Sequence, residues 1–198
     1  MLEEAIIKIP PIMLALTVHE YAHALVSNYL GDPTPREQGR LTLNPFKHLS
    51  LLGTALFLFG PFGWAKPVQF SPDYFDDPKK GTALVALAGP LSNVIQAAIF
   101  LILLAIYGQN GPWMQMAKFG VIINTMIFVF NFMPIPPLDG SKILYFFLPS
   151  WVVSLSEKAG SVLLFTALII NFVWYPWFTN MFNPIMSFTN HLIVIVCR

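Results

Sequence analysis

Long apolar runs separated by short polar segments dominate the sequence. The runs cover approximately residues 5–30, 49–65, 81–107, 116–133, 143–155 and 160–178, and a weaker run covers 185–197. Several of them reach the roughly 20 residues that a helix needs to cross the hydrocarbon core of a bilayer. The pattern therefore predicts an all-α polytopic membrane protein with about six transmembrane helices.

A large soluble core is the competing explanation for so much apolar sequence. The polar linkers are too short to form a solvated shell around such a core. Only 11% of the residues are charged, against about 25% in a globular chain, and the mean hydropathy is +0.64. We therefore expect an integral, multi-pass membrane protein in contact with the lipid bilayer.

Prolines and glycines limit where regular helix is expected within two of these runs. Pro10 and Pro11 are best tolerated in the first turn of a helix, so the first long helix should begin near residue 11. It should end at a capping glycine, Gly31. In the run 49–65, three glycines and a proline interrupt the apolar sequence. Such backbone is tolerated at membrane depth only where it is buried in protein or lines a cavity, which predicts a small re-entrant β element near residues 49–70.

The placement of basic residues predicts an orientation in the membrane. Most of them lie in the loops between the first long helix and the second, whereas the connection at 108–116 has none. Those in the loops are Arg36, Arg40, Lys47, Lys66, Lys79 and Lys80. By the positive-inside rule these loops face the cytoplasm. The net charge of +1 and the lack of a basic patch give no reason to expect a nucleic-acid partner.

Three costly polar residues stand in the middle of the first apolar run. His19, Glu20 and His23 lie in "LALTVHEYAHALVS", and an ionisable residue within a spanning helix costs at least about 2.5 kcal/mol and usually marks function. The i, i+4 spacing places both imidazoles on one helix face, with Glu20 about 100° away around the helix. This is the H-E-x-x-H pattern, in which the histidines bind zinc and the glutamate is the general base. An inert hydrogen-bonded cluster is the alternative.

A catalytic zinc site normally has a third protein ligand. The lone cysteine, Cys197, excludes a cysteine cluster, which leaves His48, His191, Asp139 and the loop acids. Asp139 ends the segment "NFMPIPPLDG", whose prolines interrupt helix and leave carbonyls without donors, so this turn can aim a carboxylate at the metal. We expect Asp139 to be the third ligand. Helix capping by Asp139 and ligation by His48 are the alternatives, and His191 is expected to be structural.

The two motifs together resemble a known family. "HEYAH" and "NFMPIPPLDG", separated by about 110 residues, resemble those of the site-2 protease family of intramembrane zinc metalloproteases, in particular its compact bacterial-type members. "GRLTLNPFKHL", "PFGWAKPV" and "LAGPLSN" resemble further segments, so the resemblance covers about residues 14–148. The chain departs from the family pattern at Ser50 and Leu51, and after "DG" at Ser141 and Lys142.

The resemblance implies one membrane-embedded metalloprotease domain over residues 1–198, with a catalytic core at about 5–148 and C-terminal helices at about 149–198. It implies Zn²⁺ bound by His19, His23 and Asp139, with Glu20 as the catalytic acid and base. The substrates it implies are transmembrane segments of other proteins, cut in regulated intramembrane proteolysis. The implied location is a bacterial cytoplasmic membrane, with the active site nearer the cytoplasmic side. The resemblance leaves open whether the protein forms a homo-oligomer.

Three further residues are candidates for binding substrate or stabilising an oxyanion: Asn93, Asn131 and His48. In the family the corresponding asparagines lie near the active site, and such a donor is worth about 3 to 4 kcal/mol in other hydrolases. Packing between helices is the alternative role for the two amides. In "GWAKPV" the resemblance favours an edge strand that pairs with an unwound substrate, and the alternative is an interfacial anchor through Trp64 and Lys66.

A membrane transporter or channel is the alternative function. Intramembrane His, Glu and Asp side chains can relay protons or metal ions. Transporters, however, often contain internal repeats, and the sequence holds no second copy of the histidine pair. A catalytically silent binding protein of the same fold is a third hypothesis, which the intact Glu20 disfavours.

Overall fold

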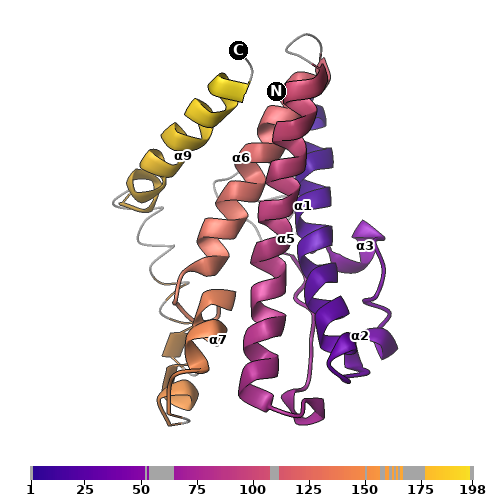
Figure 1. Cartoon of the computed structure of the whole chain (residues 1–198), viewed down its shortest axis with the longest axis vertical. Helices are drawn as coiled ribbons and strands as arrows, with labels where there is room; N and C mark the ends of the chain where they lie inside the picture. Colours follow the sequence, from indigo (N-terminus) through magenta and orange to yellow (C-terminus); the bar gives the residue numbers. More distant parts are fainter. Residues whose placement is uncertain are drawn as a thin grey trace.

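The fold is a bundle of long helices. A computed structural model describes residues 2–51, 53, 65–107, 112–149, 151–156, 159–160, 162, 164, 166 and 177–196. Among these residues the structure is mostly helical and contains no β-strand. Helices α1 (Leu2–Tyr29), α5 (Pro78–Tyr107) and α6 (Pro112–Phe132) pack side by side (Figure 1). Helix α9 (Trp177–Val196) contacts α6 and α5.

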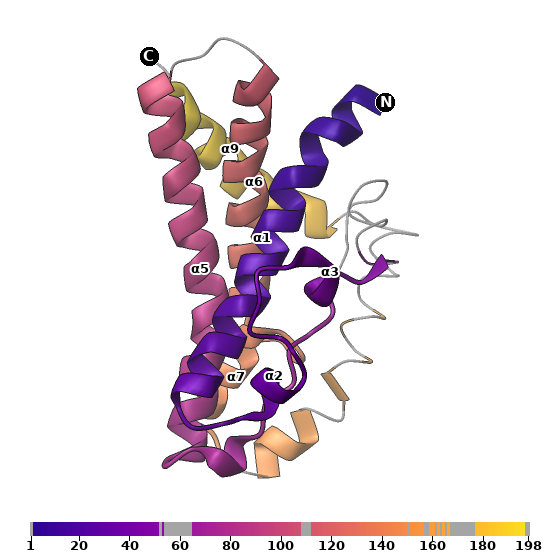
Figure 2. The same ribbon diagram turned by 90° about the vertical axis from the view of Figure 1, so that its right-hand side faces the viewer.

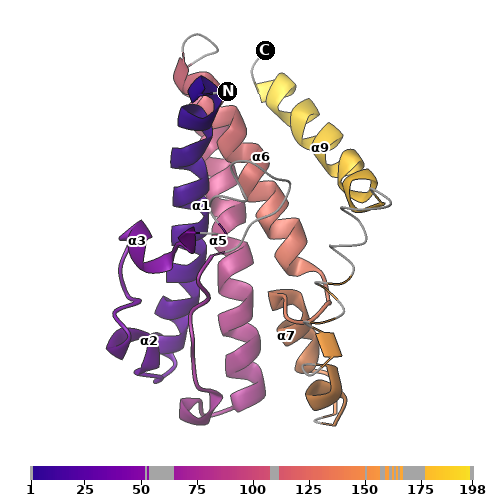
Figure 3. The same cartoon turned by 180° about the vertical axis from the view of Figure 1, so that it is seen from behind.

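Short elements surround the long helices. Helices α2 (Thr34–Glu37) and α3 (Pro45–His48) lie beside α1 (Figure 2). The 3₁₀ turn η1 (Pro72–Tyr74) precedes α5 and contacts it. Helix α7 (Asp139–Tyr145) follows the proline-rich turn after α6 and packs against α5 and α6 (Figure 3). This packing brings the start of α7 toward the middle of the bundle.

Helix α1 begins earlier than expected. It starts at Leu2 rather than near residue 11, so Pro10 and Pro11 lie inside it, and the prediction of its start was wrong. Prolines inside a helix leave two carbonyls of the preceding turn without intrahelical donors. Neighbouring helices can compensate for this loss in membrane-type bundles. Pro11 is fully buried, so packing around it outweighs its poor helix propensity.

The other end of α1 agrees with the prediction of a glycine cap. Gly31 has a φ of +103°, a left-handed conformation that glycine adopts without strain. Its N–H donates to Asn28 O at 3.2 Å, and the N–H of Asp32 donates to Ser27 O at 3.1 Å. These two bonds form a Schellman motif, which satisfies carbonyls at the end of the helix.

The structure supports the prediction of apolar helices that could span a membrane, but its described residues contain fewer of them than the six expected. Two described helices are long and apolar enough to cross a membrane, Pro78–Tyr107 and Trp113–Phe132, and Phe182–Val196 is a shorter apolar helix. Most of the expected spans at 49–65 and 160–178 lies outside the described residues. The described part of the chain therefore accounts for two of the expected six spans.

The region of the expected β element is described only at its two ends. Leu49 and Ala65 form an isolated antiparallel bridge, and the N–H of Lys66 donates to His48 O at 2.7 Å. Residues 66–70 then run without helix or strand. Residue 52 and residues 54–64 lie outside the described part, and no strand forms in the rest of 49–70.

An apolar cluster fixes α1 against α6. It consists of Ile12, Ala15, Leu16, Ile123 and Ile127. The polar residues of the H-E-x-x-H motif follow this cluster by one turn of α1, since Ala15 and His19 share a helix face. The cluster thereby anchors the helix that carries the motif.

Candidate metal centre

His19, His23 and Asp139 converge inside the bundle. Their ligand atoms all lie within 4.8 Å of one another. Asp139 Oδ2 is 3.2 Å from Nε2 of each histidine, and the two Nε2 atoms are 3.0 Å apart. The three residues are 4% to 8% exposed. Helix α1 thus supplies two donors on one face, and the start of α7 supplies the third.

Hydrogen bonds on the far side of each imidazole determine which ring nitrogen carries the proton. His23 Nδ1 lies 2.7 Å from the backbone carbonyl of Val85, which can only accept, so Nδ1 donates. His19 Nδ1 lies 2.7 Å from Asn93 Oδ1 and donates in the same way. In neutral imidazoles both Nε2 atoms then carry lone pairs. Two lone pairs and a carboxylate oxygen face one another, an arrangement that a bound cation stabilises.

A glycine lets α5 approach the two imidazoles. A β-carbon at Gly89 would lie 2.5 Å from Cε1 of His23 and 2.6 Å from Cε1 of His19. Val85 and Asn93, the hydrogen-bond partners of the two rings, stand one turn before and one turn after this glycine. The close approach of α5 at Gly89 therefore makes both hydrogen bonds possible.

Glu20 lies next to the ligands but outside the ligand group. Its Oε2 accepts a hydrogen bond of 2.8 Å from the N–H of Val68, and the residue is 7% exposed. Val68 belongs to the stretch 66–70, which has neither helix nor strand and follows the bridge between Leu49 and Ala65. A backbone donor from a distant segment therefore holds the carboxylate that the motif assigns as general base.

Comparison with known proteins agrees with this geometry. The Bacillus subtilis protein named "Putative zinc metalloprotease YwhC" is 37% identical over 180 residues, which cover 83% of this chain and 82% of that protein. The relative from Mycolicibacterium smegmatis named "Putative zinc metalloprotease Rip2" is 30% identical over 136 residues, or 65% of this chain and 52% of that protein. No family model and no solved structure matches the chain.

The chain belongs to this family of zinc metalloproteases. The finding confirms the resemblance to the site-2 protease family that the paired motifs carry. The implied metal is Zn²⁺, and the donor set fits it, because two imidazoles and one carboxylate are typical protein ligands of a catalytic zinc ion. His19, His23 and Asp139 are the described residues that could hold the ion.

The other candidate histidines of the metalloprotease lie outside the ligand group. His48 is fully buried, and its Nε2 donates to Thr42 O at 2.7 Å. Burial and the nearby Arg40 guanidinium lower the pKa of His48, so the ring is neutral at neutral pH. His191 is exposed on α9. Neither ring joins the described cluster of His19, His23 and Asp139.

The two candidate asparagines of the metalloprotease differ in their surroundings. Asn131 Nδ2 donates to Ile127 O, one turn earlier in α6, at 3.0 Å. Asn93 is fully buried, and its Nδ2 donates to Ala15 O at 3.3 Å and to Asn124 Oδ1 at 2.8 Å. With Oδ1 bonded to His19, both polar atoms of the Asn93 amide have partners inside the protein. Its contacts therefore fit the positioning of His19 better than the expected binding of substrate.

Lys142 is a site residue that the sequence marked only as a departure from the family. Its Nζ lies 3.7 Å from Asp139 Oδ1 and 5.5 Å from the ring centroid of Phe70. The ammonium therefore faces the carboxylate oxygen that points away from the histidines. Its charge offsets part of the charge of Asp139 while leaving Oδ2 to the metal site.

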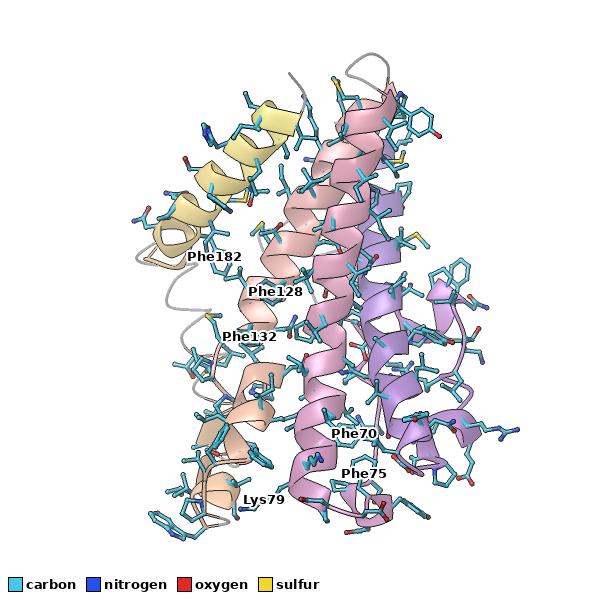
Figure 4. All side chains as sticks on the ribbon, in the orientation of Figure 1. Phe70, Phe75, Lys79, Phe128, Phe132 and Phe182 are labelled. Atoms are coloured by element: carbon cyan, nitrogen blue, oxygen red, sulfur yellow. The ribbon has the colours of Figure 1, made fainter. Side chains whose placement is uncertain are left out.

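Buried polar contacts attach the 66–71 segment to the rest of the site. The Arg40 guanidinium donates to Lys47 O and Lys66 O, so it ties α3 to the start of the segment. The other end is held by Asp32, whose Oδ2 accepts from the N–H of Ser71 at 2.8 Å. Phe70 and Phe75 stack with centroids 6.1 Å apart beside α5 (Figure 4). These contacts fix the segment that bonds Glu20.

Proposed function

We propose that the protein is an intramembrane zinc metalloprotease that hydrolyses peptide bonds within or near the transmembrane segments of other membrane proteins. The observation that carries the proposal is the convergence of two Nε2 lone pairs and Asp139 Oδ2 beside the buried Glu20. Structural hydrogen-bond clusters pair donors with acceptors, whereas this cluster, with both imidazoles neutral, gathers acceptors around one point. Such a cluster suits a metal ion.

His19, His23 and Asp139 would hold the zinc ion, and Glu20 would act as the acid and base. When bound, zinc polarises the scissile carbonyl and lowers the pKa of water. Glu20 accepts the proton of the attacking water and returns it to the leaving amine. The N–H of Val68 bonds Oε2 of Glu20, so Oε1 would be the oxygen that takes the proton.

The apolar surface of the bundle supports action within the membrane. Helix α5 carries a row of large apolar side chains that are 43% to 66% exposed: Leu91, Val94, Ile95, Ile99, Ile102 and Ile106. On a soluble protein, an exposed apolar surface of this extent would be a liability. Val85, Gly89 and Asn93, which contact the metal-binding histidines, lie within the same helix. The centre would then lie at bilayer depth.

The stretch 66–70, which has neither helix nor strand, supports the binding of an unwound substrate. Its backbone passes Glu20 at Val68, while the side chains of Lys66, Pro67 and Gln69 are exposed. A substrate that pairs with this stretch as an added strand would bring its peptide bonds next to the catalytic carboxylate. Helical substrate would have to unwind first, because a helix shields its own peptide bonds.

Zinc analysis and a Glu20→Gln variant test the function. Purified wild-type protein in detergent should hold about one zinc per chain, as expected for a single catalytic site. Glu20→Gln should keep the zinc and lose cleavage of membrane proteins, since it removes the base and leaves all three ligands. Wild type without stoichiometric zinc, or unchanged cleavage by the variant, would refute the proposal. Ion flux without cleavage would instead favour a transporter.

A further inference from the structure

We infer that Asn124 is a positioning residue of the metal centre: acting through Asn93, it holds His19 in the tautomer that presents Nε2 to the metal. The inference rests on the proposed function in that it takes His19 to be a zinc ligand. Asn124 belongs to none of the motifs in the sequence. It lies in the apolar helix α6, and like Asn93 it is fully buried.

The chain of hydrogen bonds begins at a group whose role is unambiguous. The backbone carbonyl of Gly120 can only accept, and Asn124 Nδ2 lies 2.8 Å from it. The amide of Asn124 must therefore turn its NH₂ group toward Gly120. Its Oδ1 then faces α5, where it accepts a hydrogen bond of 2.8 Å from Asn93 Nδ2.

Asn93 passes this orientation to His19. Its Nδ2 donates both to Asn124 and, in a longer bond of 3.3 Å, to the carbonyl of Ala15. Its Oδ1 is thereby fixed toward α1, where His19 Nδ1 lies 2.7 Å away. Because Oδ1 can only accept, Nδ1 carries the proton and Nε2 keeps its lone pair. The direction of each bond follows from the acceptor carbonyls of Gly120 and Ala15.

Because both amides are buried, Asn124 controls which way the Asn93 amide points. A flipped Asn93 amide would place NH₂ against the Nδ1–H of His19 and Oδ1 against the carbonyl of Ala15. Water could not replace the hydrogen bonds lost in such a flip, since both asparagines are 0% exposed. Without Asn124, the longer bond to Ala15 would alone oppose this flip. His19 could then also adopt the Nε2–H tautomer, which cannot bind the metal.

Zinc affinity of the purified full-length chain in detergent tests the inference. We expect Asn124→Leu to weaken zinc binding by about tenfold, the lower end of the effect of removing a partner of a metal ligand. The control is Thr125→Val, which removes a comparable side-chain bond in α6, that of Thr125 Oγ1 to Val121 O at 2.9 Å, without a link to His19. Competition with a chelator of known affinity gives the dissociation constant for zinc of each variant.

Nitrogen NMR of the zinc-free protein reads the tautomer directly. The chain has four histidines, so ¹⁵N-labelled imidazoles give few signals, and His19→Gln identifies those of residue 19. Wild type and Thr125→Val should show His19 protonated at Nδ1. Asn124→Leu should show a population protonated at Nε2. A loss of packing that leaves the Asn93 amide in place would not produce this change.

A second variant covers the case in which Asn124→Leu does not fold. In Asn124→Ser the short hydroxyl can bond the carbonyl of the preceding turn but cannot reach Asn93, so the same two changes are expected. Wild-type tautomer and wild-type zinc affinity in either folded variant would overturn the inference. The tautomer of His19 and the zinc affinity are both measured without substrate. Wild type that binds no zinc would refute the proposed function, whereas unchanged tautomers in the variants would refute the role of Asn124 alone.

Discussion

At the scale of single residues, Asp139 decides whether the two histidines form a complete metal site. Its Oδ2 lies equally far from both Nε2 atoms, while its Oδ1 faces Lys142. Two neutral imidazoles alone would leave the charge of a bound dication without an anionic ligand. The carboxylate would provide that ligand from a segment far along the chain.

Replacing the carboxylate by an amide should remove zinc without removing bulk. Asp139→Asn keeps the shape of the side chain and loses its charge, so we expect the zinc content to fall well below one per chain, as measured by elemental analysis of purified protein. The exposed acid Asp73 provides the control, Asp73→Asn, which should keep its zinc. Full zinc content in Asp139→Asn would exclude this carboxylate as a ligand and return His48 to consideration.

Gly89 is the second residue on which the centre depends. A β-carbon there would lie about 1 Å closer to both imidazoles than ordinary van der Waals contact allows. We therefore expect Gly89→Ala to separate α5 from the histidines and to weaken zinc binding at least tenfold, as the loss of the partners of both rings should. Ala98→Val, on the exposed face of α5, adds more volume and should leave zinc affinity unchanged. Equal affinity in the two variants would contradict the close packing at Gly89.

Residues that are related within one helix could be predicted from the sequence, whereas residues that are related by packing between helices could not. His19, Glu20 and His23 lie within one stretch of helix, and the 3.6-residue period alone places them. Asp139 was suggested by the prolines before it. The roles of Gly89 and Asn124 depend instead on which faces of α5 and α6 meet α1. A single sequence shows an amide among apolar residues but does not show its partner.

At the scale of elements, the stretch 66–70 supplies the backbone N–H that bonds Glu20 Oε2. Val68→Pro removes the N–H that bonds Glu20 Oε2 while keeping an apolar side chain. A hydrogen bond to a charged group is worth about 1.5 to 3 kcal/mol, so we expect cleavage to fall by about tenfold or more, with zinc content unchanged. The matched control is Gln69→Ala, which alters an exposed neighbour. Unchanged cleavage in Val68→Pro would show that Glu20 needs no support from this segment.

The junction after α1 is stabilised by Asp32, and this contribution should depend on pH. Burial raises the pKa of Asp32, but hydrogen bonds from Thr34, Ser71 and Ser27 outweigh it and lower the pKa below its ordinary value. A carboxyl whose folded pKa is lowered stabilises the fold fully above its unfolded pKa of about 3.9. That stability is lost as the pH falls toward the folded pKa.

Thermal unfolding in detergent between about pH 7 and pH 3 tests the role of Asp32, the range being set by an unfolded pKa of about 3.9. Asp32→Asn should lower the Tm at pH 7 and flatten its decline below about pH 4. The exposed Asp76 supplies the control, because Asp76→Asn should follow the wild-type profile. A variant at Asp32 with the same decline as wild type would contradict the assignment.

The elements also show where sequence patterns were insufficient. The prolines suggested a late start for α1, because helix propensity ignores the packing that buries Pro11. The glycine cap at Gly31 was predictable, since a positive φ requires a particular residue type. For the β element near 49–70, the described residues contain a single bridge, and its glycine-rich centre lies outside them.

At the scale of the whole molecule, the metal centre lies nearer one end of the bundle. His23 stands in the last turns of α1, and Val85 stands in the first third of α5. The basic loops follow α1 at this same end, and the positive-inside rule assigns such loops to the cytoplasm. We therefore propose that water reaches the centre from the cytoplasmic side.

The position of cleavage in membrane proteins tests the central claim most directly. Membranes that contain wild-type protein are compared with membranes that contain Glu20→Gln at equal zinc content, and new peptide termini are identified by mass spectrometry. We expect termini that appear only with wild type and map within or next to transmembrane segments. Wild-type termini confined to soluble domains, or identical termini in both samples, would contradict an intramembrane protease built on Glu20.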